Sequence, residues 1–169
     1  MVVLGIDQSY TQIGIAVTKG TSQKDGEILL VRSYNYKKLK TKTEKRRFVF
    51  KLVQRAIEKF KPNLIVIERI RIFSQGTVSK AYMTATGALN ATIVDAAFPQ
   101  KVYSVDTRCW KSRVCGRASG IVNHDKNVSV RYVLGRFQEK YNDDEADAIC
   151  ISLFGLSYDK FNKLLKEEN

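Results

Sequence analysis

Short apolar runs near the start of the chain predict three β-strands joined by brief connections. These runs cover residues 2–6, 13–17 and 27–36. Between the second and third runs lies Lys24-Asp25-Gly26, and an Asp-Gly pair tolerates the positive φ of tight hairpin turns. We therefore expect the three strands to form an antiparallel meander.

The hydrophobic period then changes from strand-like to helical. Residues 44–60 carry apolar side chains at helical spacing, and Pro62 ends this pattern because proline disfavours helical geometry in the residue before it. Residues 64–67 form a continuous apolar run, which is typical of a buried central strand. An alanine-rich helix is expected over residues 77–97, and a fifth strand over residues 101–105.

The last third of the chain reads as a loop followed by helices. Residues 115–125 are rich in glycine and polar side chains, and helical patterns follow around 127–140, 144–156 and 158–166. This order of elements predicts an α/β protein with a five-stranded mixed sheet flanked by helices. No repeat or shift in composition marks a boundary, so we expect residues 1–169 to form a single domain.

Composition excludes several classes of protein. Hydrophobic residues make up 44% of the chain and only two residues are proline, which excludes disordered and collagen-like chains. We expect no membrane span, because no apolar run has the necessary length, and no signal peptide, because the N-terminus lacks a basic region. The three cysteines form no CxxC pair, which favours packed or free thiols at Cys109 and Cys115 in a reduced, cytoplasmic protein.

The charge balance indicates a polyanionic partner. The formal net charge is +12, and such an excess on a small chain favours nucleic acid, with plain solubility as the alternative. The densest basic stretch runs through residues 37–42 to Lys45, Arg46 and Arg47. We favour contact with phosphates for these side chains, because each neutralised phosphate releases counterions. A solvated start of a helix is the alternative.

Acidic residues supply the candidate chemistry. Asp7 and Glu68 end apolar strands, where mixed α/β folds place their sites. In the run 142–147, Asp144 and Asp147 would share one helix face, but Asp143 paired with Asp147 would do so as well. Helix capping explains one or two such acids and explains the whole cluster poorly. Carboxylates suit Mg²⁺, and two ions about 3.5–4 Å apart can assist phosphodiester cleavage.

Three acidic motifs follow one another along the chain: Gly5-Ile6-Asp7 before the second strand, Val66-Ile67-Glu68 closing the fourth, and Asp144-x-x-Asp147-Ala148 opening a late helix. In order and spacing they resemble the RuvC Holliday junction resolvases. The resemblance implies a ribonuclease-H-like fold and makes Asp7, Glu68, Asp144 and Asp147 ligands to Mg²⁺ or Mn²⁺, with two ions per site. It also implies a homodimer, with the 77–97 helix at its interface, that makes paired nicks in four-way junctions and leaves 5′-phosphate and 3′-hydroxyl ends.

Weaker matches to the family propose DNA contacts. Lys111 lies in a segment where RuvC enzymes place a basic residue near the scissile phosphate, and Arg113 follows it. Lys126 resembles a second such lysine. In the family an aromatic residue soon after the strand-end glutamate stacks on bases at the junction. Here Phe73 is the candidate for that role, and Arg71 is a candidate DNA contact in the same region.

Other functions share parts of this pattern. A ribonuclease H acting on RNA–DNA hybrids has a similar acid layout, but the single histidine and the late Asp-x-x-Asp pair argue against it. A non-catalytic junction-binding protein with structural acids is the non-enzymatic alternative. We expect branched DNA as the partner, no membrane and no small-molecule cofactor. We place the protein in the cytoplasm of a bacterium or of a phage-infected host. Departures from the family pattern, such as Gln8-Ser9 in place of the usual Pro-Gly, fit a phage-encoded branch.

Overall fold

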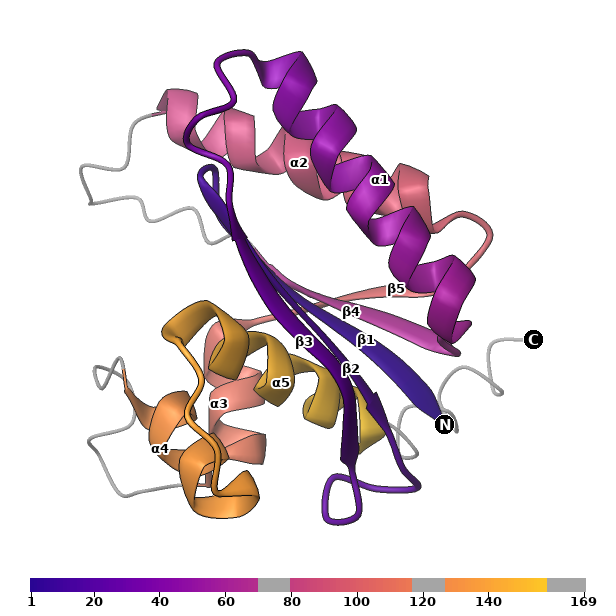
Figure 1. Ribbon diagram of the computed structural model, residues 1–169, viewed down its shortest axis with the longest axis vertical. Helices are drawn as coiled ribbons and strands as arrows, with labels where there is room; N and C mark the ends of the chain where they lie inside the picture. Colours follow the sequence, from indigo (N-terminus) through magenta and orange to yellow (C-terminus); the bar gives the residue numbers. More distant parts are fainter. Residues whose placement is uncertain (70–79, 117–126, 158–169) are drawn as a thin grey trace.

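The computed structural model describes residues 1–69, 80–116 and 127–157. A single mixed sheet forms its centre, with helices on both faces (Figure 1). The strand order is β3-β2-β1-β4-β5; the first three strands are antiparallel neighbours, and β4 and β5 continue the sheet in parallel. This confirms the predicted meander and the five-stranded mixed sheet. The strands are β1 Val2–Gln8, β2 Gln12–Lys19, β3 Glu27–Asn35, β4 Leu64–Glu68 and β5 Val102–Val105.

In the part of the chain that the structure describes, α1 (Lys42–Phe60) and α2 (Lys80–Ala97) cover one face of the sheet, and α3 (Thr107–Val114), α4 (Val128–Phe137) and α5 (Asp143–Leu156) cover the other (Figure 1). The start of the predicted 77–97 helix and the whole predicted 158–166 helix fall outside the described residues. In the described ranges, every helix is too short or too polar to cross a bilayer.

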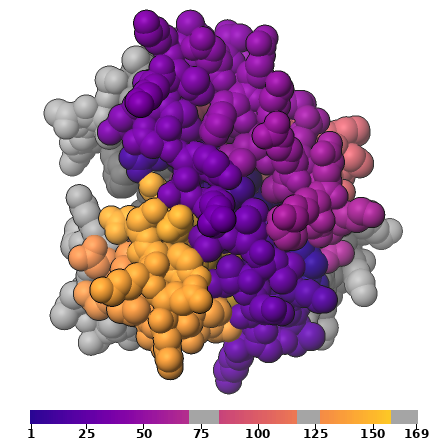
Figure 2. All heavy atoms as spheres, in the orientation of Figure 1, coloured from indigo at the N-terminus to yellow at the C-terminus, as the bar shows by residue number. Residues whose placement is uncertain are grey.

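Alternation along the strands divides the interior into two cores. In β1, Leu4 and Ile6 pack against the α1–α2 layer, whereas Val3 packs with the α3–α5 layer. In the space-filling view, purple atoms of α1 and β3 lie beside orange atoms from the α4–α5 part of the chain (Figure 2). Because side chains on a strand alternate between faces, Asp7 lies on the same face as Val3, the face that α5 covers.

Small residues allow α5 to lie directly on the sheet. A Cβ atom at Gly5 would overlap the backbone nitrogen of Ser152, and one at Gly14 would overlap the carbonyl oxygen of Asp144. Gly14 is also the residue that pairs with Asp7 across β1 and β2. The first turns of α5 are therefore brought close to the end of β1 that carries Asp7.

The connection between β2 and β3 differs from the predicted hairpin turn. Neither Asp25 nor Gly26 has a positive φ, and residues 20–26 form a wider loop. The carboxylate of Asp25 accepts hydrogen bonds from the backbone N–H groups and hydroxyls of Thr21 and Ser22, which stabilises this loop from within. The loop packs against the C-terminal end of α5, so a long-range contact determines its shape. A turn signal in the local sequence does not predict such a contact.

Helix α3 is absent from the sequence-based prediction. Asp106 begins it, because its side chain accepts a hydrogen bond from the N–H group of Arg108. Trp110 and Val114 are its buried residues. Two buried positions in an eight-residue helix are too few to produce a clear helical period.

Candidate active site

Asp7 and Glu68 lie next to one another at the same end of the sheet. Asp7 stands near the end of β1, and Glu68 is the last residue of β4. Because β1 and β4 are parallel neighbours, with Ile6 paired to Ile67, the two acids emerge side by side. This is the placement that the strand-end pattern predicts.

The N-terminal turns of α5 supply the other acids. Asn142 caps this helix by accepting a hydrogen bond from the N–H group of Glu145, whose side chain in turn accepts one from the backbone of Asn142. The capping box explains why the helix begins at this point and not later. Asp144 and Asp147 are partly buried, whereas Asp143 is exposed. The side chain of Asp144 therefore lies nearer the sheet than that of Asp143.

Asp7 lies close to the other three acids. Burial raises the pKa of Asp7 well above its ordinary value, and the charges of Glu68, Asp147 and Asp144 raise it further. Burial raises the pKa of Asp147 to about 6, against the opposing effect of Lys111. Negative charge from three separate elements is thus concentrated at one end of the sheet.

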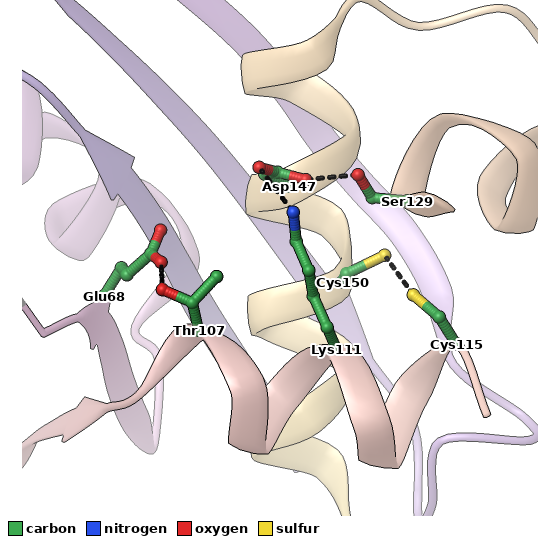
Figure 3. A network of polar contacts seen from close by, with 7 residues as sticks. All are labelled: Glu68, Thr107, Lys111, Cys115, Ser129, Asp147 and Cys150. Atoms are coloured by element: carbon green, nitrogen blue, oxygen red, sulfur yellow. Dashed lines mark hydrogen bonds and ion pairs between the residues drawn. The ribbon is translucent and has the colours of Figure 1, made fainter. Parts of the chain in front are cut away.

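Two of these carboxylates are held by hydroxyl groups from neighbouring helices (Figure 3). The hydroxyl of Thr107, at the start of α3, donates a hydrogen bond to Oε1 of Glu68. The hydroxyl of Ser129, in the first turn of α4, donates one to Oδ1 of Asp147. Each bond fixes the orientation of an acid through a residue on another helix, which is the arrangement that supports ligands in metal sites.

Gln12 holds a third carboxylate. Its side-chain nitrogen lies 2.5 Å from Oδ2 of Asp144 and donates a hydrogen bond to it. The hydroxyl of Tyr36 anchors the start of β2, where Gln12 lies, because it donates to the carbonyl oxygens of Ser9 at 2.5 Å and of Gln12 at 3.1 Å. Sequence reasoning does not identify Gln12, Thr107 or Ser129, since these common neutral residues lie far along the chain from the acids that they contact.

Lys111 brings a positive charge close to one of the acids. Its Nζ atom lies 3.9 Å from Oδ2 of Asp147, and the two side chains are only 17% and 20% exposed (Figure 3). The same Nζ lies 5.1 Å from the ring centre of the fully buried Trp110. Arg113, on the same helix, is exposed. The predicted site lysine therefore lies inside the acid cluster, and the predicted DNA-contacting arginine lies on the surface.

The acids have the right chemistry for a divalent cation, although they do not already surround one point. Among the residues that the structure describes, no three histidine, cysteine, aspartate or glutamate side chains converge closely enough to enclose a metal. Like charges repel, and Glu68, Asp144 and Asp147 each turn toward a donor in the protein. Carboxylate oxygens are nonetheless the ligands that Mg²⁺ and Mn²⁺ prefer, and a cation would relieve the repulsion that raises the pKa of Asp7.

Lys45 lies inside the protein. The sequence predicts that it contacts phosphates, but this prediction is wrong because its side chain is buried, with 5% exposed. Its Nζ atom lies 3.3 Å from the carbonyl oxygen of Tyr10 and 3.6 Å from the centre of the Tyr10 ring. The lysine therefore packs inside the protein against the loop that follows Asp7, where it has no access to a DNA backbone.

The other predicted DNA contacts fall into two groups. Arg46 and Arg47 are exposed on α1, and the Nε atom of Arg46 donates a hydrogen bond to the hydroxyl of Thr92 on α2. Both arginines border a surface hollow of about 430 Å³ between these two helices. The remaining candidates lie outside the described residues: Arg71, Phe73 and Lys126.

Comparison with known proteins decides the family. The family model described as crossover junction endodeoxyribonuclease RuvC matches residues 3–154. The chain belongs to the RuvC family. It is accordingly a crossover junction endodeoxyribonuclease, of a family whose members depend on metal ions and resolve Holliday junctions. The predicted family and function are confirmed. No curated protein matches this sequence.

Solved structures of RuvC proteins share the fold. The chain resembles Thermus thermophilus RuvC in complex with a Holliday junction substrate, with a TM-score of 0.76 at 19% identity, covering 95% of this chain and 96% of that one. A second structure of Thermus thermophilus RuvC gives a TM-score of 0.72 at 22% identity, covering 96% and 97%. The yeast mitochondrial Holliday junction resolvase Ydc2 gives 0.65 at 14% identity, covering 99% of this chain and 84% of that one. These matches confirm the ribonuclease-H-like fold.

Proposed function

We propose that this RuvC-family chain resolves four-way DNA junctions by hydrolysing phosphodiester bonds at the acid cluster formed by Asp7, Glu68, Asp144 and Asp147. The observation that carries the proposal is that Glu68 on β4 and Asp147 and Asp144 on α5 lie close enough to the buried Asp7 on β1 to raise its pKa further. Placing several acids together weakens the fold through charge repulsion unless a bound cation offsets that repulsion. Such an arrangement is therefore typical of a functional site.

The four carboxylates would hold Mg²⁺, or Mn²⁺ in its place, with two ions per site. Bound there, the ions would supply an activated water and stabilise the oxygen that leaves the phosphorus. The chain itself holds the acids in place. Thr107 orients Glu68, Ser129 orients Asp147, and the carboxamide of Gln12 orients Asp144.

Lys111 would orient the phosphate that is cut. In the structure its Nζ atom lies 3.9 Å from Asp147, whose negative charge a cation would partly neutralise. The ammonium group would then donate hydrogen bonds to a non-bridging oxygen of the scissile phosphate. An oriented donor at developing negative charge stabilises the transition state more than the bound substrate.

Basic surface residues would hold the arms of the junction. Arg46, Arg47 and Arg113 are exposed, and the net charge of +12 favours long-range attraction to DNA. The same role is proposed for Arg71, Phe73 and Lys126. It is not proposed for Lys45, which is buried. Most of these contacts would fall on phosphate and sugar, which suits recognition of a branched shape more than of a base sequence.

Two copies of the chain would act on one junction, with α2 at their interface. Val94 is 47% exposed and Phe98, just beyond the end of α2, is 84% exposed, which is unusual for large apolar side chains. On the same helix, a Cβ atom at Gly87 would meet no atom within 4 Å among the described residues, so a second helix could approach closely. A dimer would present two acid clusters to one junction and so produce paired cuts.

Mapping the cuts on an immobile four-way junction, with each strand labelled in turn, tests this proposal. We expect symmetric nicks in two opposite strands, with ends that DNA ligase can rejoin because they carry 5′-phosphate and 3′-hydroxyl groups. An RNA–DNA hybrid of the same length serves as the matched substrate and should stay intact. Cutting of the hybrid with an intact junction would instead support the ribonuclease H alternative.

A further inference from the structure

Two thiols meet directly beside the acid cluster. The Sγ atoms of Cys115 and Cys150 lie 4.0 Å apart (Figure 3). Cys115 is half-buried at the C-terminal end of α3, and Cys150 is fully buried in α5. The Lys111–Asp147 ion pair joins the same two helices, one turn earlier along each. The two contacts therefore tie α3 to α5 at adjacent levels.

We propose that Cys115 and Cys150 are an oxidative modification site, at which a reversible disulfide forms and slows DNA cleavage. The effect on cleavage rests on the function proposed above, whereas formation of the disulfide does not. Sulfur atoms in a disulfide are about 2.05 Å apart, so the two thiols would have to approach each other by roughly 2 Å. Rotation of the side chains and a small shift of the end of α3 would together provide this movement.

A peroxide is the oxidant that suits this pair, because the first thiol to react must be reached from solvent. The Cys115 thiolate would attack one peroxide oxygen, so that the O–O bond breaks, hydroxide leaves and a sulfenic acid forms. The sulfur of Cys150 would then attack the sulfur of Cys115. The S–O bond breaks, water leaves with the Cys150 proton, and the two sulfurs have lost two electrons to the peroxide.

The surroundings favour this order of events. The hydrogen bond with Cys150 lowers the pKa of Cys115, against the opposing effects of burial and of Asp147, and Lys111 lowers it a little further. Burial raises the pKa of Cys150 well above its ordinary value. Cys115 is thus the more exposed and the more readily ionised thiol, which is the combination that makes a cysteine reactive.

Closing the disulfide would disturb the Lys111–Asp147 contact. Lys111 lies one helical turn before Cys115, and the buried Trp110 and Val114 pack this helix tightly against its neighbours. A movement of the end of α3 toward α5 would therefore shift Lys111 relative to Asp147. Misplacing a catalytic group by about 1 Å can cost up to ~100-fold in rate, so we expect cleavage to slow by about tenfold or more while junction binding is retained.

The test uses a Cys109→Ser protein, because Cys109 is exposed on α3 and would form unrelated products. The reduced protein is treated with hydrogen peroxide, quenched, digested with trypsin and analysed by mass spectrometry. We expect a crosslink between the peptides 114–117 and 141–160, with a mass two hydrogens below their sum. Cleavage at saturating junction should fall with the appearance of this crosslink, and dithiothreitol should restore both.

Adding Cys115→Ser to this protein supplies the matched control, and its cleavage rate should not respond to peroxide. If oxidation leaves separate sulfenic or sulfinic acids and no crosslinked peptide, the inference is wrong. It is equally wrong if the crosslink forms and the cleavage rate stays the same. The mass measurement does not need activity, so a reduced protein that never cuts a junction would contradict the proposed function and not the crosslink.

Discussion

Individual carboxylates determine how the site responds to protons and cations. Asp7 and Asp147 both have raised pKa values, that of Asp147 reaching about 6, with burial as the first cause. An acid whose pKa is higher in the folded chain binds more protons when folded, so its ionisation weakens the fold as the pH rises. For Asp147 this loss extends from the ordinary pKa of about 4 up to about 6.

This gives a prediction for metal binding. Protons and cations compete for the same oxygens, so Mg²⁺ or Mn²⁺ should raise the Tm of the protein much more at pH 8 than at pH 5. Thermal unfolding at both pH values, with the metal and with EDTA, measures this difference. The variant Asp147→Asn should show a smaller metal effect at pH 8. An equal metal effect at the two pH values in the unmodified protein would show that these acids do not bind the ion.

A second prediction at this scale concerns Lys111. Replacing it with methionine keeps much of the packing on Trp110 and removes the charge, so the cleavage rate at saturating junction should fall by about 100-fold. The dissociation constant for the junction should change much less. Arg113→Met, on the exposed side of the same helix, is the matched control and should weaken binding more than it slows cutting. An unchanged rate for the Lys111 variant would show that this lysine does not take part in cleavage.

Sequence alone predicts the acids of the site but not the residues that hold them. Asp7 and Glu68 could be predicted because each ends an apolar run, and Asp147 because its spacing from Asp144 or Asp143 puts two acids on one helix face. Nothing in the sequence shows that Gln12 contacts Asp144, since that hydrogen bond depends on how α5 lies on the sheet. For Lys45 the prediction of a phosphate contact is wrong, because a basic stretch in the sequence does not reveal which of its side chains points into the protein.

At the scale of elements, the close contact between α5 and the sheet assembles the site. Gly14→Ala should push the first turn of α5 away from β2, because the new methyl group would overlap the carbonyl oxygen of Asp144. We expect the free energy of unfolding to fall by about 1–3 kcal/mol and cleavage to be lost. Denaturant unfolding and the junction assay measure the two effects.

Gly135→Ala is the matched control for this substitution. Gly135 lies inside α4, and a Cβ atom there would meet nothing within 4 Å among the described residues. Alanine is the better helix former, so this variant should be more stable by up to about 1 kcal/mol and should cut normally. A Gly14→Ala protein with unchanged stability would contradict the role given to this contact.

The elements were predicted well where the periodicity is strong and poorly where a long-range contact decides the local shape. The long α1 and the continuous apolar run of β4 were placed within a few residues. Helix α3 was missed because it is short, and the turn at Asp25 was misread because the loop adapts to α5. In both cases the local sequence carries only part of the signal that determines the structure.

At the scale of the whole molecule, the proposed paired cuts would require two copies of the chain. Small-angle scattering should therefore report a mass near twice 19.2 kDa. Phe98→Glu, at the most exposed of the large apolar side chains that the structure describes, should shift the protein toward monomer and convert paired cuts into single nicks. Leu134→Glu, at another exposed apolar position on the opposite layer, should leave the mass unchanged. A monomeric unmodified protein that still makes paired cuts would contradict this arrangement.

The proposed role of the acid cluster is tested most directly by cleavage of a labelled four-way junction with Mg²⁺ and with EDTA. The unmodified protein is compared with Asp7→Asn, Asp144→Asn and Asp143→Asn. We predict metal-dependent cutting by the unmodified protein and by the Asp143 variant, whose acid is exposed. The Asp7 and Asp144 variants should bind the junction without cutting it. Cutting by both of these variants, or tight binding without cutting by the unmodified protein in Mg²⁺ and in Mn²⁺, would contradict a catalytic role for the acid cluster.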